Sequence, residues 1–396
     1  MNMHPAEEIY CESSSKLKGR TIVMGITGSV AAVECFGAIR ELIRHGAKVI
    51  PVLTESARDF VTPLSMEYAS GNIPVTELTG ATEHVSIIGS DADVLLIYPA
   101  TANTISKIAN GIDDTPVTSM ATVALGSGLP IAIAPAMHDA MFKNPAVQKN
   151  IELLRSWGVT FIGPKKVGPR AKVASKEEVI ASVFRLLSKD DLAGKRILVI
   201  GGRSEEPIDS MRIITNRSTG LMAVRIADRA MERGADVELW MGGCSVPIPD
   251  YMNVRRFDSV SDLISMIDSI DRDIVIVPAA LSDFTPAERR NGKISSKEGF
   301  DLELEPVPKV LPLLSKRCKY VIGFKAESGL SEDELVKKAK SRMDEYGLYA
   351  IVANDIDSAG KTSSSAIIIT SDGNSNITGP KDNIADSILD QCSRIA

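Results

Sequence analysis

Short apolar runs of strand length alternate with amphipathic helical patterns, and this alternation begins twice along the chain. The first series contains RTIVMGI, AKVIPVL, DVLLIYPA and LPIAIAPAM, at residues 20–26, 47–53, 93–100 and 129–137. Helical patterns separate these runs, for example at residues 31–45, 105–110 and 146–157. Continuous apolar strands joined by helices are typical of parallel sheets that are covered on both faces. The sequence therefore predicts an α/β fold with a doubly wound parallel sheet.

The alternation starts again at DLAGKRILVIGG, residues 191–202, whose pattern is close to that of KLKGRTIVMGITG at residues 16–28. A helical pattern at 218–233 follows, and further apolar runs stand at residues 235–243, 273–280, 319–328, 348–355 and 365–370. A chain of 396 residues is also too long for one ordinary hydrophobic core. We therefore predict a polar N-terminal tail at residues 1–18, a first domain at 19–188 and a second, Rossmann-like α/β domain at 189–396.

The composition argues against a nucleic-acid or membrane partner. The formal net charge is −6 at pH 7, and no block of Lys and Arg stands out along the chain. No apolar run is long enough to span a bilayer, and the N-terminal segment lacks the apolar stretch of a signal peptide, which predicts a cytoplasmic protein. The five cysteines are scattered without a C-x-x-C pair, so neither a disulfide framework nor a zinc cluster is expected.

A glycine-containing loop follows the first strand, in MGITGSVAAVE at residues 24–34. The dinucleotide fingerprint G-x-G-x-x-G requires three glycines, whereas this stretch has Gly25 and Gly28 and no third glycine before the helix. After a neighbouring strand, Thr101, Asn103 and Thr104 stand where a helix would begin. Hydroxyl and amide groups beside free N–H groups suit a monophosphate, although a plain helix cap has the same pattern. Together, the strand ends favour a mononucleotide over a dinucleotide.

Five motifs of the first domain occur in an order that resembles the homo-oligomeric flavin-containing cysteine decarboxylases. They are GITGSVAAVE, TESARDFVTP, EHVSI, PATANTISKIANGIDD and PAMHDAM, within residues 19–165. The resemblance implies a flavodoxin-like domain, bound FMN and oxidative decarboxylation of a cysteine carboxylate. The FMN contacts that it implies are Gly28, Ser29, Val30, Thr54, Pro99, Ala100, Thr101, Asn103 and Thr104.

The same resemblance implies two catalytic histidines. His84 matches the family's histidine that orients the substrate carboxylate or moves a proton. His138 stands where the family has an asparagine that binds this carboxylate, and an imidazole can also donate a hydrogen bond there. The flap sequence GPKKVGPRAKVAS, residues 163–175, lacks the cysteine that many members use to protonate the product. Either basic residues of the flap replace this cysteine or the stretch is a solvated loop; they are Lys165, Lys166, Arg170 and Lys172.

The second domain opens with VIGGRSEEPIDSMRIITNRSTGLMA, residues 199–223, which resembles the start of the phosphopantothenate–cysteine ligases. The resemblance implies that Asn216 holds the activated acyl group. Ser218, Thr219 and Gly220 stand where a helix would begin, and a helix N-terminus suits a phosphate.

Three further stretches, at residues 277–294, 307–311 and 322–327, continue the resemblance and imply a CTP site. The implied contacts are Ala279, Ala280, Asp283, Lys293, Pro308, Lys309, Val310, Leu311, Phe324 and Arg342. Lys293 would neutralise charge at the phosphates, and Phe324 would flank the base. Arg342 matches one of two family lysines on the next helix, whereas Tyr346 takes the place of the other. Mg²⁺ would arrive bound to the nucleotide, so no metal ligand is assigned.

The order of the two domains resembles the bifunctional phosphopantothenoylcysteine decarboxylase/phosphopantothenate–cysteine ligase family of coenzyme A biosynthesis. The family implies CTP-dependent ligation of cysteine to 4′-phosphopantothenate through an acyl-cytidylate, followed by FMN-dependent decarboxylation to 4′-phosphopantetheine. It also implies a homo-oligomer with trimeric flavin domains and dimeric ligase domains. Two alternatives stay open: an active ligase whose flavin domain only binds FMN and acts as a scaffold, and a non-enzymatic flavin- or nucleotide-binding regulator. The glycine spacing argues against a dehydrogenase built from two dinucleotide-binding halves.

Overall fold

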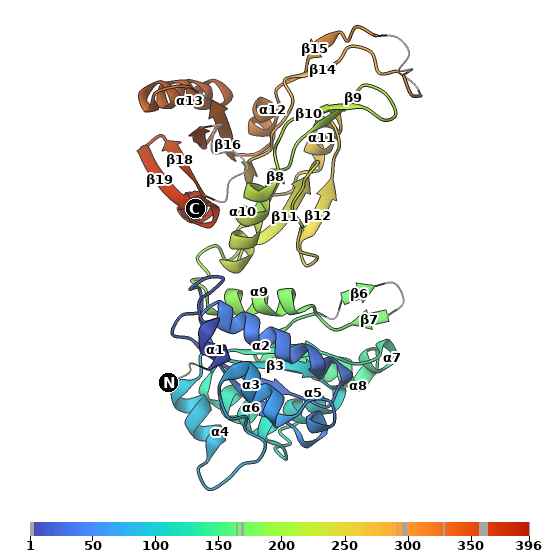
Figure 1. Cartoon of the computed structure of the whole chain (residues 1–396), viewed down its shortest axis with the longest axis vertical. Helices are drawn as coiled ribbons and strands as arrows, with labels where there is room; N and C mark the ends of the chain where they lie inside the picture. Colours follow the sequence, from blue (N-terminus) through green and yellow to red (C-terminus); the bar gives the residue numbers. More distant parts are fainter. Residues whose placement is uncertain are drawn as a thin grey trace. The chain divides into compact units, whose positions relative to one another are not determined.

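The computed structural model describes residues 4–163, 165–167, 170–290, 292–294, 299–327, 329–355 and 363–395, of which residues 165–167, 170–172, 355, 363 and 364 are described by their backbone alone. The chain divides into two compact units, Met1–Ser188 and Lys189–Ala396, coloured blue to green and green to red in Figure 1. Each unit contains a sheet with helices on both faces.

The sheet of the first unit is parallel throughout and has the strand order β2-β1-β3-β4-β5. Its strands are β1 (Thr21–Ile26), β2 (Lys48–Leu53), β3 (Val94–Ala100), β4 (Ile131–Pro135) and β5 (Thr160–Phe161). All residues of β1 and β3 are buried, as expected for strands covered on both faces. The order is that of flavodoxin-like folds, which confirms the predicted fold class of this unit.

Successive strand residues of the first unit point into two different hydrophobic cores. Met24 packs into the core beneath α2 (Cys35–Arg44), α3 (Pro63–Ser70) and α9 (Lys176–Leu187), whereas Val23 packs into the core on the opposite face. The helices on that second face are α5 (Ala102–Ala109), α6 (Pro116–Ser127) and α8 (Pro145–Ser156). Short helices complete the unit: η1 (Val30–Glu34), η2 (Glu55–Asp59), α4 (Glu83–Ser86), η3 (Ile87–Asp91) and α7 (Asp139–Phe142). The helix predicted from residue 31 therefore begins with a 3₁₀ turn. The strands β6 (Lys165–Val167) and β7 (Arg170–Lys172) form a separate hairpin.

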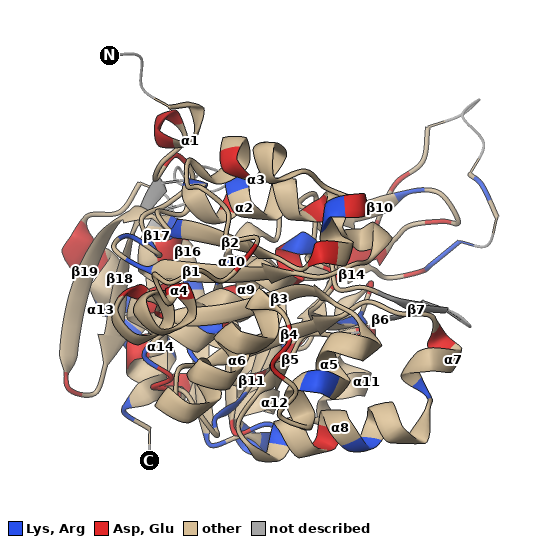
Figure 2. Ribbon diagram, turned by 90° about the horizontal axis from the view of Figure 1, so that it is seen from below, with Lys and Arg blue, Asp and Glu red and all other residues tan. Residues whose placement is uncertain are grey.

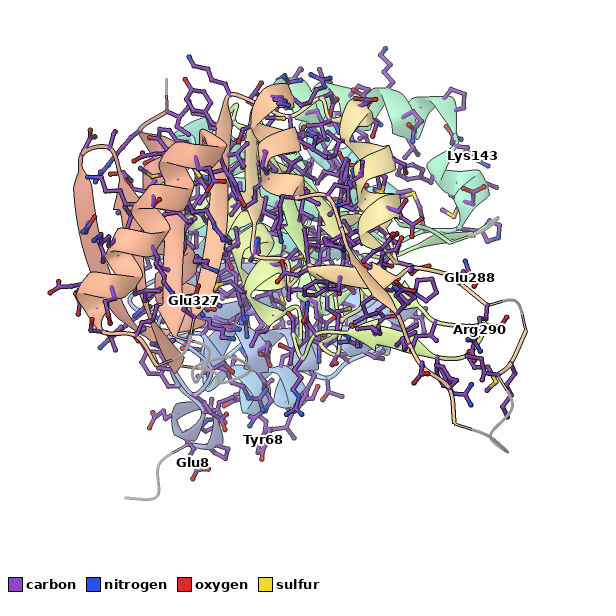
Figure 3. All side chains as sticks on the ribbon, turned by 90° about the horizontal axis from the view of Figure 1, so that it is seen from above. Glu8, Tyr68, Lys143, Glu288, Arg290 and Glu327 are labelled. Carbon is purple, nitrogen blue, oxygen red and sulfur yellow. The ribbon has the colours of Figure 1, made fainter. Side chains whose placement is uncertain are left out.

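The N-terminal segment differs from the polar tail that the sequence predicts. Residues Pro5–Glu8 form the helix α1, and the side chains of Ala6 and Leu17 are buried. Tyr68 of α3 lies beside α1, which carries Glu8, as Figure 3 shows. Only a few apolar residues of the segment pack on the first unit. Because the rest of the segment is polar, its sequence does not indicate this packing.

His45 joins this N-terminal segment to the core and gives the first unit a pH-dependent stability. Its Nδ1 lies 2.7 Å from Ser14 Oγ, and its ring packs edge-on against Phe184. Burial lowers the pKa of His45, although Glu41 opposes this effect. The folded chain therefore binds this proton less readily than the unfolded chain, and the free energy of unfolding should fall as the pH decreases below about 6.5. Urea unfolding of the wild type and His45→Gln at several pH values measures this, and an equally steep decrease in the variant would contradict it.

The sheet of the second unit has the order β12-β11-β8-β13-β16-β17-β18-β19. Its strands are β8 (Arg196–Gly201), β11 (Asp236–Met241), β12 (Asn253–Arg256), β13 (Ile274–Val277), β16 (Tyr320–Glu327), β17 (Ala350–Asp355), β18 (Ser363–Thr370) and β19 (Gly373–Pro380). The strands from β12 to β17 are parallel and have the order of a Rossmann sheet, which confirms the predicted fold class. The last two strands, β18 and β19, are antiparallel.

Helices cover both faces of this second sheet. One face packs against α10 (Leu221–Glu232) and α14 (Lys381–Ser393), and the other against α11 (Val260–Met266), η4 (Ile267–Ser269), α12 (Val310–Arg317) and α13 (Glu332–Tyr346). Two hairpins lie outside the sheet: β9 (Glu205–Pro207) with β10 (Ile213–Thr215), and β14 (Phe284–Pro286) with β15 (Leu304–Pro306). They run beside each other in Figure 1, and Figure 2 shows both acidic and basic residues on them. Among the described residues, no helix has the length and apolar composition needed to cross a membrane.

Candidate functional site

Three hydroxyl side chains cap the segments that follow neighbouring strands of the first sheet. Ser29 accepts a hydrogen bond from the N–H of Ala31 at 3.3 Å, and Thr54 accepts one from Ala57 at 3.3 Å. Thr101 caps α5 by accepting from the N–H of Thr104 at 3.3 Å. Since β2, β1 and β3 are adjacent and parallel, these caps lie along the same carboxyl edge of the sheet. The hydroxyls of Ser29 and Thr54 accept these bonds and keep a proton to donate, and Thr101 shares a hydrogen bond with Thr104 at 3.2 Å, so the edge offers hydroxyl groups that fit a phosphate.

Thr27 connects two of these strand ends and was missed by the sequence prediction. Its Oγ1 donates to the carbonyl of Pro99 at 2.7 Å and accepts from the N–H of Thr101 at 3.0 Å. The side chain is buried, so both hydrogen bonds are shielded from water. Thr27 therefore fixes the start of α5 relative to the loop after β1. A polar residue directly after a buried strand is the signal that could have identified it.

Gly28 is required where the loop after β1 passes η2. A Cβ atom at this position would lie 2.5 Å from the Cβ of Ser56, which is too close for any side chain. This glycine therefore permits the close approach of two backbone segments. The remaining predicted FMN contacts differ in accessibility: Pro99, Ala100 and Thr104 are buried, whereas Val30 and Asn103 are exposed.

His84 lies on the one-turn helix α4 and has an unsatisfied ring nitrogen. Its Nδ1 is buried, and the described residues provide no hydrogen-bond partner for it. Thr82, two residues earlier, has a φ of 51°, and the π-helical turn η3 follows α4 directly. A strained backbone, a π-helical turn and an unpaired buried nitrogen around one histidine are features that gather at functional sites. The turn is held by the N–H of Thr79, which donates to Glu83 Oε2 at 2.9 Å.

His138 caps the helix α7 through its ring. The N–H of Ala140 donates to His138 Nδ1 at 3.3 Å, and the side chain is exposed. Asparagine is among the preferred residues at helix N-caps, so an asparagine at this position would cap α7 in the same way. Because Nδ1 is the acceptor, neutral His138 carries its proton on Nε2, where it can be donated outward.

The flap side chains on which the prediction depends lie outside the described residues. The backbone forms the hairpin β6–β7, but the side chains of Lys165, Lys166, Arg170 and Lys172 are not among those described.

In the second unit, the ends of β8 and β13 are joined to the segment that carries Asn216. The N–H of Ala280 donates to the carbonyl of Gly202 at 2.8 Å, and the N–H of Ser204 donates to the carbonyl of Ala280 at 3.2 Å. Asn216 Nδ2 donates to that same carbonyl at 3.0 Å. The buried Ser204 hydroxyl accepts from the N–H of Ser282 at 2.9 Å. The structure thus places Asn216 against the predicted nucleotide-binding loop.

Gly202 has a φ of +80°, and a Cβ atom there would lie 2.8 Å from the carbonyl oxygen of Gly243. The glycine is therefore needed for the left-handed backbone and for the approach of two strand ends. Gly220 precedes α10 with a φ of 81°, and no side chain caps this helix. The helix predicted at residues 218–233 thus begins at Leu221, after Ser218 and Thr219.

The predicted CTP contacts come from several elements of the second unit. Asp283 forms an ion pair with Lys309, the residue before α12, and Val310 and Leu311 pack into the core. Phe324 packs on the face of α10 and α14. Arg342 belongs to α13, which covers the opposite face, and its guanidinium stacks on Tyr346 at 5.5 Å from the ring centroid. Arg342 and Phe324 therefore approach the strand ends from different faces.

Lys293 is exposed on the segment between β14 and β15. The next residue, Ile294, donates its N–H to Asp209 Oδ2 at 3.1 Å. Burial of this carboxylate opposes its ionisation, but three backbone N–H groups and one guanidinium outweigh burial and lower the pKa of Asp209. Asp209 therefore remains an anion at neutral pH. Asp209 belongs to the motif at residues 199–223, but the sequence alone indicated no role for it.

The two sheets define a two-domain α/β protein, and the comparisons with known families place it among flavoproteins. Residues 10–188 match the family model described as Flavoprotein, and residues 192–395 match the one described as DNA/pantothenate metabolism flavoprotein C-terminal domain. A protein of Thermococcus kodakarensis named coenzyme A biosynthesis bifunctional protein CoaBC is 44% identical over 93% of this chain and 94% of its own length. The protein of the same name from Methanocaldococcus jannaschii is 36% identical over 99% of this chain and 98% of its own length.

A crystal structure of the DNA/pantothenate metabolism flavoprotein from Streptococcus pneumoniae is 26% identical, covers 51% of this chain and 100% of that chain, and has a TM-score of 0.46. From the matches over nearly the whole sequence, the chain belongs to the CoaBC family of bifunctional enzymes of coenzyme A biosynthesis. The predicted family and the prediction of a bifunctional enzyme are confirmed.

Proposed function

We propose that the second unit joins cysteine to 4′-phosphopantothenate with CTP, and that the first unit uses FMN to remove CO₂ from the 4′-phosphopantothenoylcysteine formed. The observation that carries the proposal is the arrangement of polar groups at the carboxyl edge of each sheet. Ser29, Thr54 and Thr101 line the first edge, and Asn216 is tied to the loop at the second. The name of the relatives, which specifies a bifunctional protein of coenzyme A biosynthesis, supports two activities in one chain.

In the first unit, bound FMN would supply a reversible two-electron oxidation that amino-acid side chains lack, and because the electrons return to the product after CO₂ is lost, no external oxidant is needed. The caps Ser29, Thr54 and Thr101 would hold its phosphate. The unpaired nitrogen of His84 binds the substrate carboxylate or exchanges a proton there. His138 donates its Nε2 proton to the same carboxylate while its Nδ1 remains the cap of α7.

In the second unit, the carboxylate of 4′-phosphopantothenate attacks the α-phosphorus of CTP, which forms an acyl-cytidylate and releases pyrophosphate. Activation comes first because a free carboxylate is a poor electrophile. Lys293 stabilises the negative charge that develops at the phosphates, with Mg²⁺ carried by the nucleotide. Asn216 holds the acyl group while the amine of cysteine displaces CMP.

Exposed apolar side chains in both units support a homo-oligomer, with trimeric flavin units and dimeric ligase units. In the second unit they lie at the two hairpins, where Met211 is 68% exposed and Phe284 is 51% exposed. In the first unit they include Val30, Leu64 and Ile73. Apolar side chains on a surface often mark contacts between subunits. Light scattering of the purified chain measures the assembly size. Cytoplasmic localisation stays a prediction.

The proposal is tested with the purified full chain, 4′-phosphopantothenate, CTP, Mg²⁺ and cysteine. A yellow protein with a flavin spectrum should release pyrophosphate, CMP and CO₂ and form 4′-phosphopantetheine. Accumulation of 4′-phosphopantothenoylcysteine without CO₂ would instead support a flavin unit that acts only as a scaffold. Ligand binding without pyrophosphate or CO₂ release would overturn both activities.

A further inference from the structure

The segment that carries Lys293 is attached at several points to the turn between β9 and β10. The N–H of Arg290 donates to the carbonyl of Ile208 at 3.0 Å, and the N–H of Ser210 donates to the carbonyl of Gly292 at 3.2 Å. Figure 3 labels Arg290 and Glu288 on this projecting part of the second unit. The described residues before and after Lys293 therefore both bond to the turn between β9 and β10.

Asp209 is the centre of this attachment. Its Oδ1 accepts from the N–H groups of Met211 and Arg212, both at 2.7 Å. Its Oδ2 accepts from the Arg212 guanidinium at 2.5 Å and from the N–H of Ile294 at 3.1 Å. The same guanidinium donates to the carbonyl of Ile294 at 3.2 Å. The Asp209 side chain is 0% exposed and that of Arg212 is 36% exposed, so the carboxylate that binds the N–H of Ile294 is buried while Arg212 binds the carbonyl of Ile294 at the edge of the cluster.

The turn also leads directly to Asn216. β10 ends at Thr215, whose hydroxyl donates to the carbonyl of Ser204 at 2.7 Å. Asn216 follows and donates to Ala280. One carboxylate thus connects the segment of Lys293 to the strand that presents Asn216. These are the two residues proposed to act on the phosphates and on the acyl group in the same half-reaction.

We propose that Asp209 is a positioning residue of the ligase, which sets the place of Lys293 relative to Asn216 by holding Ile294. The inference rests on the proposed ligase function. A charge that stabilises a transition state must be held in place before the reaction, and a displacement of about 1 Å can reduce a rate by about 100-fold. Asp209 supplies this support without contact to substrate.

A second aspartate–arginine pair in the same unit provides a matched control. Asp273 accepts from Arg196 Nε and Nη2 at 2.9 and 2.7 Å, at the opposite edge of the sheet, where β8 and β13 begin. Its side chain is 50% exposed, and that of Arg196 is 48% exposed. Asp273→Asn removes a charge of the same kind from a pair that lies far from the carboxyl edge.

The test uses the full chain and measures pyrophosphate release from 4′-phosphopantothenate and CTP before cysteine is added. In Asp209→Asn, the NH₂ of the new amide faces two N–H donors whichever way the amide is turned, because each carboxylate oxygen accepts from two donors. We expect kcat to fall by about 10- to 100-fold with little change in the KM for CTP, and Asp273→Asn to retain its rate. In the Lys293→Gln background, Asp209→Asn should reduce the rate by less than about twofold, because it acts through Lys293.

Multiplicative losses in the double variant, or a rate of Asp209→Asn equal to that of Asp273→Asn, would overturn the inference. Failure of the wild type to release pyrophosphate would overturn the proposed function instead, so the two failures are distinguishable. If Asp209→Asn does not fold, Arg212→Lys is used, because a lysine can pair with Asp209 but cannot also reach the carbonyl of Ile294 in the same planar geometry. It should show the same non-additivity with Lys293→Gln, and additive losses would overturn the inference.

Discussion

Replacement of His84 by asparagine is expected to reduce CO₂ release from 4′-phosphopantothenoylcysteine by at least about 100-fold, the usual size of a general acid–base contribution. Within the described part of the chain, Nδ1 of His84 has no hydrogen-bond partner, so it can pair with a group of the substrate. Asparagine can form hydrogen bonds but cannot accept and return a proton near neutral pH. The measurement is CO₂ release together with the flavin absorbance of the purified variant. Ligation should be unchanged, because the two proposed activities belong to separate units.

His4→Asn is a matched control for this substitution. His4 caps α1 by accepting from the N–H of Ala6 at 3.1 Å, and asparagine serves equally well at such a position. This control should release CO₂ at the rate of the wild type. An equal loss of ligation in His84→Asn would contradict the assignment of the two activities to separate units, and an unchanged CO₂ rate would contradict the role of His84.

Replacement of Lys293 by glutamine is expected to slow the formation of acyl-cytidylate by about 100- to 1000-fold, the cost typical of removing one group that stabilises developing charge. Glutamine keeps a hydrogen-bond donor but removes the positive charge. Pyrophosphate release in the absence of cysteine isolates this step. The flavin absorbance and the decarboxylation of supplied 4′-phosphopantothenoylcysteine should stay at the wild-type level.

Lys319→Gln removes an equivalent charge at the other end of the same sheet and serves as the control. Lys319 precedes β16, and its ammonium group lies 4.9 Å from the ring centroid of Tyr320. If Lys319→Gln lost as much pyrophosphate release as Lys293→Gln, the loss would not be specific to Lys293. This result would contradict the role proposed for Lys293.

The strands were predictable because each is a buried run with a clear boundary. The run predicted at residues 20–26 is the strand Thr21–Ile26, and the cap of α5 at Thr101 follows from a hydroxyl at the start of a helical pattern. The directions of β18 and β19 were not predictable, because an apolar run of strand length has the same pattern whether it pairs in parallel or antiparallel fashion. The packing of α1 depends on few apolar residues and left no periodic signal.

The caps at Ser29 and Thr54 were predictable as polar residues that follow a strand, whereas their contacts with FMN stay a prediction. Contacts between distant parts of the chain were not predictable. Asp209 and Ile294 are 85 residues apart in sequence, and nothing in the pattern around either residue indicates that they meet. The ion pair between Asp283 and Lys309 was not predictable for the same reason. The sequence pattern suggested each residue separately as a nucleotide contact.

Gly28 and Gly202 show that a glycine in a loop after a strand can be retained for architectural reasons. At Gly28 the space for a side chain is filled by Ser56, and at Gly202 it is filled by the backbone of Gly243. A descendant of this protein that had lost its flavin or its nucleotide would still need both glycines to fold. A glycine at such a position therefore indicates a close approach of two backbone segments, and a cofactor in a distant sequence should be inferred from the hydroxyl residues that follow the glycines.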